Sequence, residues 1–347
     1  MREAVENEPY GRGFCAPSDR ILAMTMQSEP VAVPPVVQYL DGLVDQLRMH
    51  AAGVLDTGAV ESVHQARVTT RRLRAASDLL RPLLKSGARD RFNHLQRKVR
   101  RRLGPIRDLD VLTALLTDFS DADSTAAAAW MLDALAPTRT DLLQTASKDK
   151  AVARLPLKLG PWYKIRAQII DHAASIDPLL SESLHDQIDA FAARARELAE
   201  AQPGVDPHQV RIAGKSLRYT LELAAAHGHA LEESLLKSFK KLQDALGTWH
   251  DFVVLAEQSL LLSAERMVAH HDIKLQRSVL ALANAALTFA EGQLEKFNRL
   301  WSEHGEGLAE SIRAAFPLSQ PVEPVTEPKT DHDPADSTPP EIPDGPH

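Results

Sequence analysis

Two short stretches of the chain carry rows of basic side chains whose spacing suits an anionic ligand. The rows are His64, Arg67, Arg71 and Arg74, with Arg72 beside them, and His208, Arg211, Lys215 and Arg218. At 3.6 residues per turn, the members of each row fall within one narrow arc of an α-helix. Like charges one turn apart repel each other, and no acidic residue interrupts either row. The sequence therefore predicts an anion-binding face on each helix.

Apolar residues occupy the opposite side of the same helices. In the first helix they are Ala66, Leu73, Leu80 and Leu84, and in the second they are Val210 and Leu217. A helix with one apolar and one polar face packs its apolar face into a core. We therefore expect each basic row to lie on the outer side of a helical bundle.

A second basic face follows each row. Its candidate ligand-binding residues are Arg97, Lys98 and Arg101 after the first row, and Lys237, Lys240 and Lys241 after the second. Gly104 and Gly247 come next, and we expect each to end its helix as a C′ glycine does. Asp108 and Asp251 would then begin the following helices, where a carboxylate stabilises the helix dipole.

The two halves of the chain repeat one another. Residues 64–74 align with 208–218 without gaps at an offset of 144 residues, and 94–112 align with 237–255 at an offset of 143. Two motifs at nearly one offset indicate an internal duplication. The second copy is less basic, because Asp244 takes the place of Arg101 and His250 that of Arg107.

Composition and charge favour a helical protein with an anionic partner. Of 347 residues, 44% are hydrophobic, 25% charged and 5% aromatic. The net charge of −7 comes from the two ends of the chain, whereas residues 64–107 hold 14 Lys or Arg and two Asp. Such a cluster points to an anion, although a solvated helix face is the alternative. The chain has one cysteine, no apolar run that would span a bilayer and no recognisable signal peptide. We therefore expect a cytoplasmic protein without membrane contact.

The helical period appears throughout the middle of the chain and predicts an all-α fold. Expected helices span 36–55, 60–86, 89–103, 107–119, 122–147, 161–174, 182–202, 207–228, 231–246, 249–266, 269–302 and 306–315. Residues 36–315 would form one domain, with halves of about 36–175 and 182–315. The ends, 1–35 and the acidic, Pro-rich 316–347, are expected to be disordered.

Other chemistries find little support in the sequence. The stretch AGKS (213–216) resembles the end of a P-loop, but that motif needs a glycine at 209, where this chain has Gln209. The 14 histidines form no HExxH motif, and no metal site, cofactor or catalytic triad is expected. An enzyme acting on phosphoanhydrides would need a carboxylate cluster for Mg²⁺ near the basic rows, and none is visible.

The paired motifs VHQARVTTRRLRAASDLLRPLL with LGPIRDLDVL, and HQVRIAGKSLRYTLEL with LQDALGTWHDFVVL, resemble the CHAD family, the conserved histidine α-helical domain. The resemblance covers about residues 36–315. It implies two four-helix bundles of long helices, related by pseudo-twofold symmetry, and a basic central cavity that binds inorganic polyphosphate. Many members are joined to a CYTH triphosphatase domain. This chain lacks an ExExK motif, so we expect a stand-alone member.

The leading hypothesis is therefore a non-catalytic polyphosphate-binding protein, which would associate with polyphosphate granules. A nucleic-acid-binding helical module is the alternative, but the basic segments offer almost no aromatic stacking platform. His64 and His208 would be protonated against a polyanion, or neutral groups that orient a neighbour. In the first case the surrounding cations should lower the two histidine pKa values until the ligand binds, whereas Arg and Lys are expected to titrate too far above neutrality to contribute.

Overall fold

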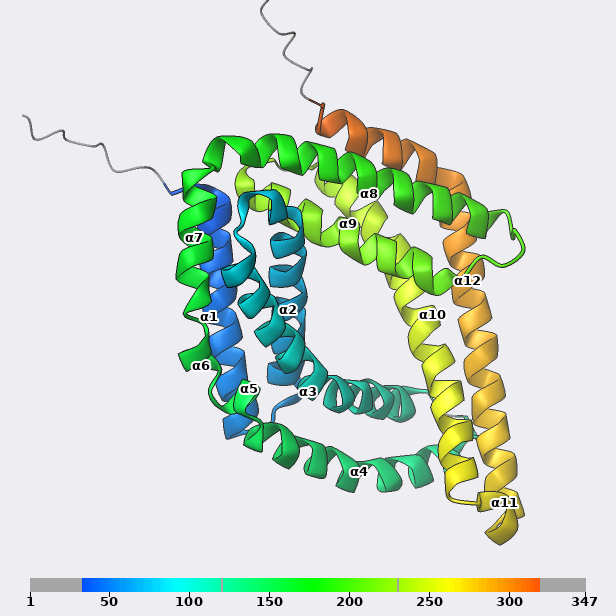
Figure 1. The fold of residues 1–347 in the computed structure, drawn as a ribbon. Helices are drawn as coiled ribbons and strands as arrows, with labels where there is room; N and C mark the ends of the chain where they lie inside the picture. Colours follow the sequence, from blue (N-terminus) through cyan, green and yellow to red (C-terminus); the bar gives the residue numbers. More distant parts are fainter. Residues whose placement is uncertain (1–32, 120, 230, 319–347) are drawn as a thin grey trace, which may run out of the picture. The chain divides into compact units, whose positions relative to one another are not determined.

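A computed structural model describes residues 33–119, 121–229 and 231–318. Every regular element in these ranges is helical, which confirms the predicted all-α class (Figure 1). The α-helices are α1 (Pro35–Asp56), α2 (Val60–Leu79), α3 (Ser86–Asp118), α4 (Thr125–Lys148), α5 (Lys150–Ala153), α6 (Leu155–Lys158), α7 (Pro161–Asp171), α8 (Ile176–Ala199), α9 (Pro207–His227), α10 (Glu233–Glu265), α11 (Val268–His271) and α12 (Ile273–Ala315). Short 3₁₀ helices span Arg81–Leu83 and Ala173–Ser175.

The two ends of the chain, 1–35 and 316–347, fall outside the described residues except for 33–35 and 316–318. Their disorder therefore stays a prediction. Both boundaries nonetheless coincide with helix ends, since α1 begins at Pro35 and α12 ends at Ala315. None of the described helices combines the length and the apolar character that crossing a membrane requires.

The apolar faces predicted from the helical period are buried. Leu73 and Leu80 are at most 2% exposed, and Val210 and Leu217 are fully covered. The helical period also predicts an apolar side for the following helices, and its residues are at most 7% exposed: Leu95, Val99, Leu103, Phe239, Leu242 and Leu246. Burial of these side chains stabilises the helices far more than their intrinsic propensity does.

Three helices run through positions where the sequence predicted an end. Gly104 lies inside α3, Gly247 inside α10, and the predicted helices 269–302 and 306–315 are both part of α12. Neither Gly104 nor Gly247 has the positive φ of a C′ glycine, whereas Gly228, with a φ of 116°, does end α9. Pro105 also lies within α3, although an interior proline removes one helical hydrogen bond. The prediction that Gly104 and Gly247 end helices is therefore wrong, because tertiary packing carries both helices onward.

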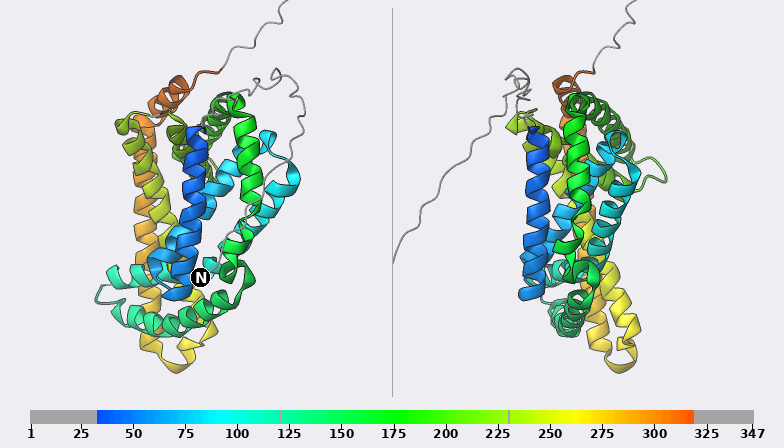
Figure 2. Two further views of the ribbon diagram at one scale, coloured as in Figure 1. Left: turned by 90° about the vertical axis from the view of Figure 1, so that its left-hand side faces the viewer. Right: turned by 60° about the vertical axis from the view of Figure 1, so that its left-hand side comes forward.

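The helices form two closed groups that pack as bundles. Helices α1, α2, α3 and α7 contact one another in sequence around one group, and α8, α9, α10 and α12 do so around the other (Figures 1 and 2). Each group falls within one predicted half of the chain. The pseudo-twofold relation between the halves stays a prediction.

The two groups meet along α2 and α9, which carry the basic rows. Helix α9 contacts both α1 and α2, and α3 contacts α10. At the start of α9, the Asp206 side chain accepts a hydrogen bond from the His208 backbone N–H at 2.8 Å, and Pro207 occupies the first turn. These are strong N-terminal signals, and they set where the second row begins.

Candidate anion-binding site

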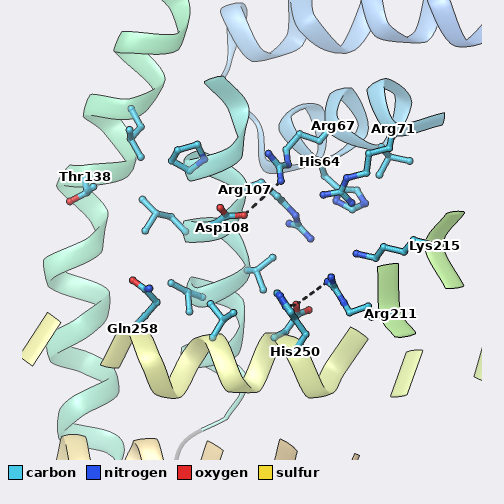
Figure 3. A pocket seen from close by; sticks show the side chains of 18 residues that line it. His64, Arg67, Arg71, Arg107, Asp108, Thr138, Arg211, Lys215, His250 and Gln258 are labelled. Atoms are coloured by element: carbon cyan, nitrogen blue, oxygen red, sulfur yellow. Dashed lines mark hydrogen bonds and ion pairs between the residues drawn. The ribbon is translucent and has the colours of Figure 1, made fainter. Parts of the chain in front are cut away.

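Two adjoining cavities, of about 680 and 740 Å³, lie between α2, α3, α9 and α10. They share six lining residues, among which are His64, Arg71, Arg211 and Lys215. We call the space around these four side chains the cationic cavity (Figure 3). Together the two cavities are lined by three aspartates and by seven Arg or Lys residues, which are Arg67, Arg71, Arg72, Arg107, Arg211, Lys215 and Arg218.

The first arginine of each row pairs with an aspartate from the neighbouring long helix. Arg67 Nη2 lies 3.8 Å from Asp108 Oδ1 (Figure 3), and Arg211 Nη2 lies 3.9 Å from Asp251 Oδ1. Both aspartates were predicted to begin a helix, but they lie in the middle of α3 and α10, one turn after the glycines. That prediction is wrong, and the role of both carboxylates is to hold an arginine.

The last arginine of each row is neutralised by an acid one turn later. Arg74 Nε donates to Asp78 at 2.6 Å, and Arg218 Nε donates to Glu222 at 2.9 Å. Glu222 also accepts a hydrogen bond from Arg72 of α2 at 2.7 Å and so links the two helices. No acidic residue lies within either row, but an acidic residue one turn after each row pairs with its last arginine.

The middle residues of the rows, Arg71 and Lys215, keep their charge uncompensated. Neither has an ion-pair partner within 4 Å in residues 33–119, 121–229 and 231–318. These two positions are equivalent in the predicted repeat, and both side chains line both cavities. A cation that is held inside a cavity without a partner carries a desolvation cost that a bound anion would relieve.

Mutual repulsion within the cavity shifts several pKa values. Burial lowers the pKa of Lys215 to about 7, and the charges of Arg211, Arg71 and Arg67 add to the effect against the opposing pull of Asp251. Burial and neighbouring cations, Arg71 among them, likewise lower the pKa values of Arg67 and Arg211. The expectation that no lysine titrates near neutrality is therefore wrong, because it neglected burial against a second helix.

The CHAD domain family profile matches residues 38–259, which include both rows and both glycine–aspartate segments. The match spans more than half of the chain. The chain belongs to the CHAD domain family. Its fold is also that of the crystal structure of the CHAD domain from the plant Ricinus communis, with a TM-score of 0.54 and 23% sequence identity over 81% of this chain and 90% of that one. No curated protein sequence matches the chain.

The histidines of this CHAD domain occupy different positions. His64 lines both cavities, and burial together with Arg107, Arg71 and Arg67 lowers its pKa, as predicted. His208 does not line either cavity. Its ring stacks on that of His250, with ring centroids 5.2 Å apart. His250, on α10, lines the cavity of about 680 Å³ in its place.

Eight of the fifteen predicted ligand-binding residues lie away from the cationic cavity. They are Arg74, Arg97, Lys98, Arg101, His208, Lys237, Lys240 and Lys241, none of which lines the two cavities. Arg74 and Arg97 line a separate pocket of about 250 Å³ together with Arg81 and Arg89. Lys237 and Lys240 pair with Glu233 and Asp244 on the exposed surface of α10. The predicted ligand-binding residues that do line the two cavities are His64, Arg67, Arg71, Arg72, Arg211, Lys215 and Arg218.

Arg107 and His250 line the cavity but were not among the predicted ligand-binding residues. They hold equivalent places in the predicted repeat, and each directly precedes one of the aspartates that hold Arg67 and Arg211. The signal was available in that register. The prediction of helix ends at Gly104 and Gly247 separates Arg107 and His250 from the basic face before them, whereas α3 and α10 continue through these glycines.

Metal chemistry finds no further support at this site. The described ranges contain no group of three or more His, Cys, Asp or Glu side chains that could hold a metal ion. Asp108 and Asp251, which line the cationic cavity, come from different helices, and each faces an arginine.

Gly104 allows Arg67 to approach the α3 backbone, and this contact yields a testable prediction. Arg67 Nη1 donates to the carbonyl oxygen of Arg100 at 3.0 Å, and a Cβ at position 104 would lie 2.8 Å from the same nitrogen. Gly104→Ala should therefore displace the guanidinium and weaken anion binding about three- to tenfold, from the loss of one hydrogen bond of about 1 kcal/mol.

Gly247→Ala is the matched control, because nothing lies within 4 Å of a Cβ at that position. Both changes replace a mid-helix glycine and should raise helix stability by up to about 1 kcal/mol. Thermal unfolding should show no loss of stability in either protein, and only Gly104→Ala should bind more weakly. Equal affinities of the two variants would show that the position of Arg67 does not matter for binding.

Proposed function

We propose that this CHAD domain binds inorganic polyphosphate in the cationic cavity without hydrolysing it. The observation that supports the proposal most is the pair of cations without an ion-pair partner, Arg71 and Lys215, which come from different helices and line the same two cavities. Burial, followed by the charges of Arg211 and Arg71, lowers the pKa of Lys215. A ligand of high negative charge density removes the repulsion between these charges at several residues at once.

Linear polyphosphate suits the layout of the rows. It carries roughly one negative charge on each internal phosphate, and successive residues of a row stand about 4.5–6 Å apart along the helix axis. Arg67 and Arg211 are only 12% and 15% exposed and are fixed by their aspartates. Arginines held in this way donate paired hydrogen bonds to phosphate oxygens with little loss of side-chain entropy.

A nucleic acid is the less favoured ligand. Binding of single strands relies on aromatic side chains on which the bases stack. Of the aromatic residues other than histidine that line the two cavities, Phe191 is buried and Tyr219 is half-buried. The cavity therefore offers one ring at most, whereas it offers seven permanent or potential cations to phosphate groups.

We further propose that the site has no catalytic role. Hydrolysis of a phosphoanhydride needs a positioned nucleophile or a metal ion that generates one. Each aspartate that lines the two cavities faces a cation: Asp108 faces Arg67, Asp251 faces Arg211, and Asp244 pairs with Lys240. A protein of this kind would collect on polyphosphate granules in the cytoplasm through binding alone.

A side-by-side titration tests the proposal. Long-chain polyphosphate and single-stranded RNA of equal total charge are added to the protein at one ionic strength, and orthophosphate is measured in parallel with Mg²⁺ present. We expect polyphosphate to bind at least about tenfold more tightly and no orthophosphate to appear. Tighter RNA binding would contradict the choice of ligand. Orthophosphate release that disappears in a His64→Ala variant would contradict the non-catalytic role.

A further inference from the structure

We propose that the cationic cavity also binds organic phosphates in which a chain of two or more phosphates carries an alkyl or isoprenoid group. The phosphates would occupy the cationic cavity, and the hydrocarbon would occupy an apolar end that continues from it. This inference rests on the proposed anion binding and specifies a second class of ligand for the same site.

The apolar end belongs to the cavity of about 680 Å³ and is formed by α3, α4 and α10. The aliphatic residues that line this cavity and not the second one are Pro105, Leu109, Val111, Leu112, Leu142 and Val254. Thr138 of α4 and Gln258 of α10 lie at this end, on the side away from Arg71 and Lys215 (Figure 3). Every lysine and arginine that lines this cavity therefore stands at one end, and the other end is uncharged.

The second cavity has a different character beyond the shared residues. There the lining continues with polar residues that include Gln65, Arg72, Arg218, Gln243 and Thr248, and with one acid, Asp244, which pairs with Lys240. An inorganic polyphosphate would extend in this polar direction, where hydrogen-bond donors and two more cations continue the site. It would gain nothing at the apolar end, because phosphate groups placed against aliphatic side chains lose hydration without gaining partners.

The apolar end is held open by the fold. Arg139 of α4 donates to Asp110 of α3 at 2.6 Å and to the carbonyl oxygen of Gly58 at 3.0 Å. Asp110 is buried, with 1% of its side chain exposed, so this ion pair fixes α4 beside α3. Leu109 and Val254 pack from behind against the core shared by α3, α4, α10 and α12. The aliphatic surface is thus a rigid wall, and a ligand does not have to create it.

The nature of the wall favours a hydrocarbon over a nucleobase. The lining of this cavity includes no Phe, Tyr or Trp, so a base would find no ring to stack on. Aliphatic side chains instead bury branched or linear alkyl groups with a gain proportional to the area removed from water. A volume of about 680 Å³ is within the range of small-molecule sites, which combine apolar walls with a few convergent polar groups.

The test compares pyrophosphate, geranyl diphosphate and ATP by calorimetry, with geranyl diphosphate kept below its aggregation threshold. We expect geranyl diphosphate to bind at least about tenfold more tightly than pyrophosphate, a ratio equivalent to about 1.4 kcal/mol, which burial of two methylene groups would supply. Geraniol, which lacks the phosphates, should not bind. Equal affinities for pyrophosphate and geranyl diphosphate would overturn the proposal, and tighter binding of ATP would overturn the preference for a hydrocarbon.

Two variants separate this inference from the proposed function. Leu142→Asn with Val254→Thr makes the apolar end polar at nearly constant volume, and it should reduce the geranyl preference to about twofold while long-chain polyphosphate binds as before. Arg71→Gln should weaken every phosphate ligand. Polyphosphate binding without a geranyl preference in the wild type would reject this inference alone. Absence of polyphosphate binding alongside geranyl diphosphate binding would reject the proposed function alone.

Discussion

Replacing Arg71 and Lys215 together with glutamine is expected to weaken binding of long-chain polyphosphate by about 10²–10⁴-fold. Each of the two cations would donate a charge-assisted hydrogen bond of about 1.5–3 kcal/mol to a phosphate, and every 1.4 kcal/mol is a factor of ten. The dependence of log affinity on log salt should flatten by roughly two phosphate contacts. Titrations at several salt concentrations measure both effects.

The matched control removes the same number of positive charges from the exposed surface of α10. Lys237 and Lys241 lie on α10, which also supplies His250 and Asp251 to the cavity, but neither lysine lines it. Lys237→Gln with Lys241→Gln should cost less than about tenfold in affinity. An equal loss in both double variants would mean that polyphosphate binds the outer surface and not the cavity.

Loss of binding in the Arg71 and Lys215 variant will not be the result of unfolding. Burial disfavours the charge of Lys215 in the free protein, and the charges of Arg211 and Arg71 add to this effect, so its pKa is lowered. Removing them should therefore raise the free energy of unfolding, and the melting temperature should increase. Residues that bind a highly charged ligand commonly reduce stability in its absence.

The affinity for polyphosphate should also fall as pH rises above neutrality, chiefly because of Lys215. Its pKa is about 7 in the free protein, against an ordinary value of 10.5. A bound polyanion stabilises the charged amine and raises that pKa. At any pH between the free and bound values the complex holds more protons than the free protein, so affinity decreases with pH at up to tenfold per unit. Measurements between pH 7.5 and 9 at constant ionic strength should show this decrease.

Lys215→Arg is the control, because arginine stays charged throughout this range. It also gives the second row an arginine at the position equivalent to Arg71 of the first row. The variant should bind about as tightly as the wild type at pH 7 and retain its affinity at pH 9.

His64→Gln should keep the decrease above pH 7.5, since burial and nearby arginines place the His64 pKa below its ordinary 6.5. An identical pH profile for wild type and Lys215→Arg would show that Lys215 does not face the ligand. Terminal phosphates gain charge with pH and act in the opposite direction, so they cannot produce the expected loss.

Features that depend on one helix at a time were predictable from the sequence. The helical period assigned Leu73, Leu217 and Val99 to the core correctly, and it placed Arg67, Arg71, Arg211 and Lys215 on one face each. The alignment of the two halves matched Arg67 with Arg211 and Asp108 with Asp251, but it did not predict that each arginine contacts its aspartate.

Features that depend on contacts between helices were not predictable in this way. Glycine is a frequent helix terminator, but the residues around Gly104 do not reveal that Arg67, 37 residues earlier, occupies the space that a side chain at position 104 would take. The link from Arg72 to Glu222 joins residues 150 positions apart. The pKa of Lys215 depends on Arg71 of another helix. Helical spacing identified the basic residues, but only the packing of α2 against α9 separates those in the cavity from those on the outer surface.

A crystal structure of the protein with tripolyphosphate would test the central claim most directly. We expect ordered phosphates between α2 and α9, with oxygens within hydrogen-bonding distance of Arg67, Arg71, Arg211 and Lys215. Phosphates ordered only against Lys237, Lys240 and Lys241, or only against Arg97, Lys98 and Arg101, with the cationic cavity left to solvent, would contradict it.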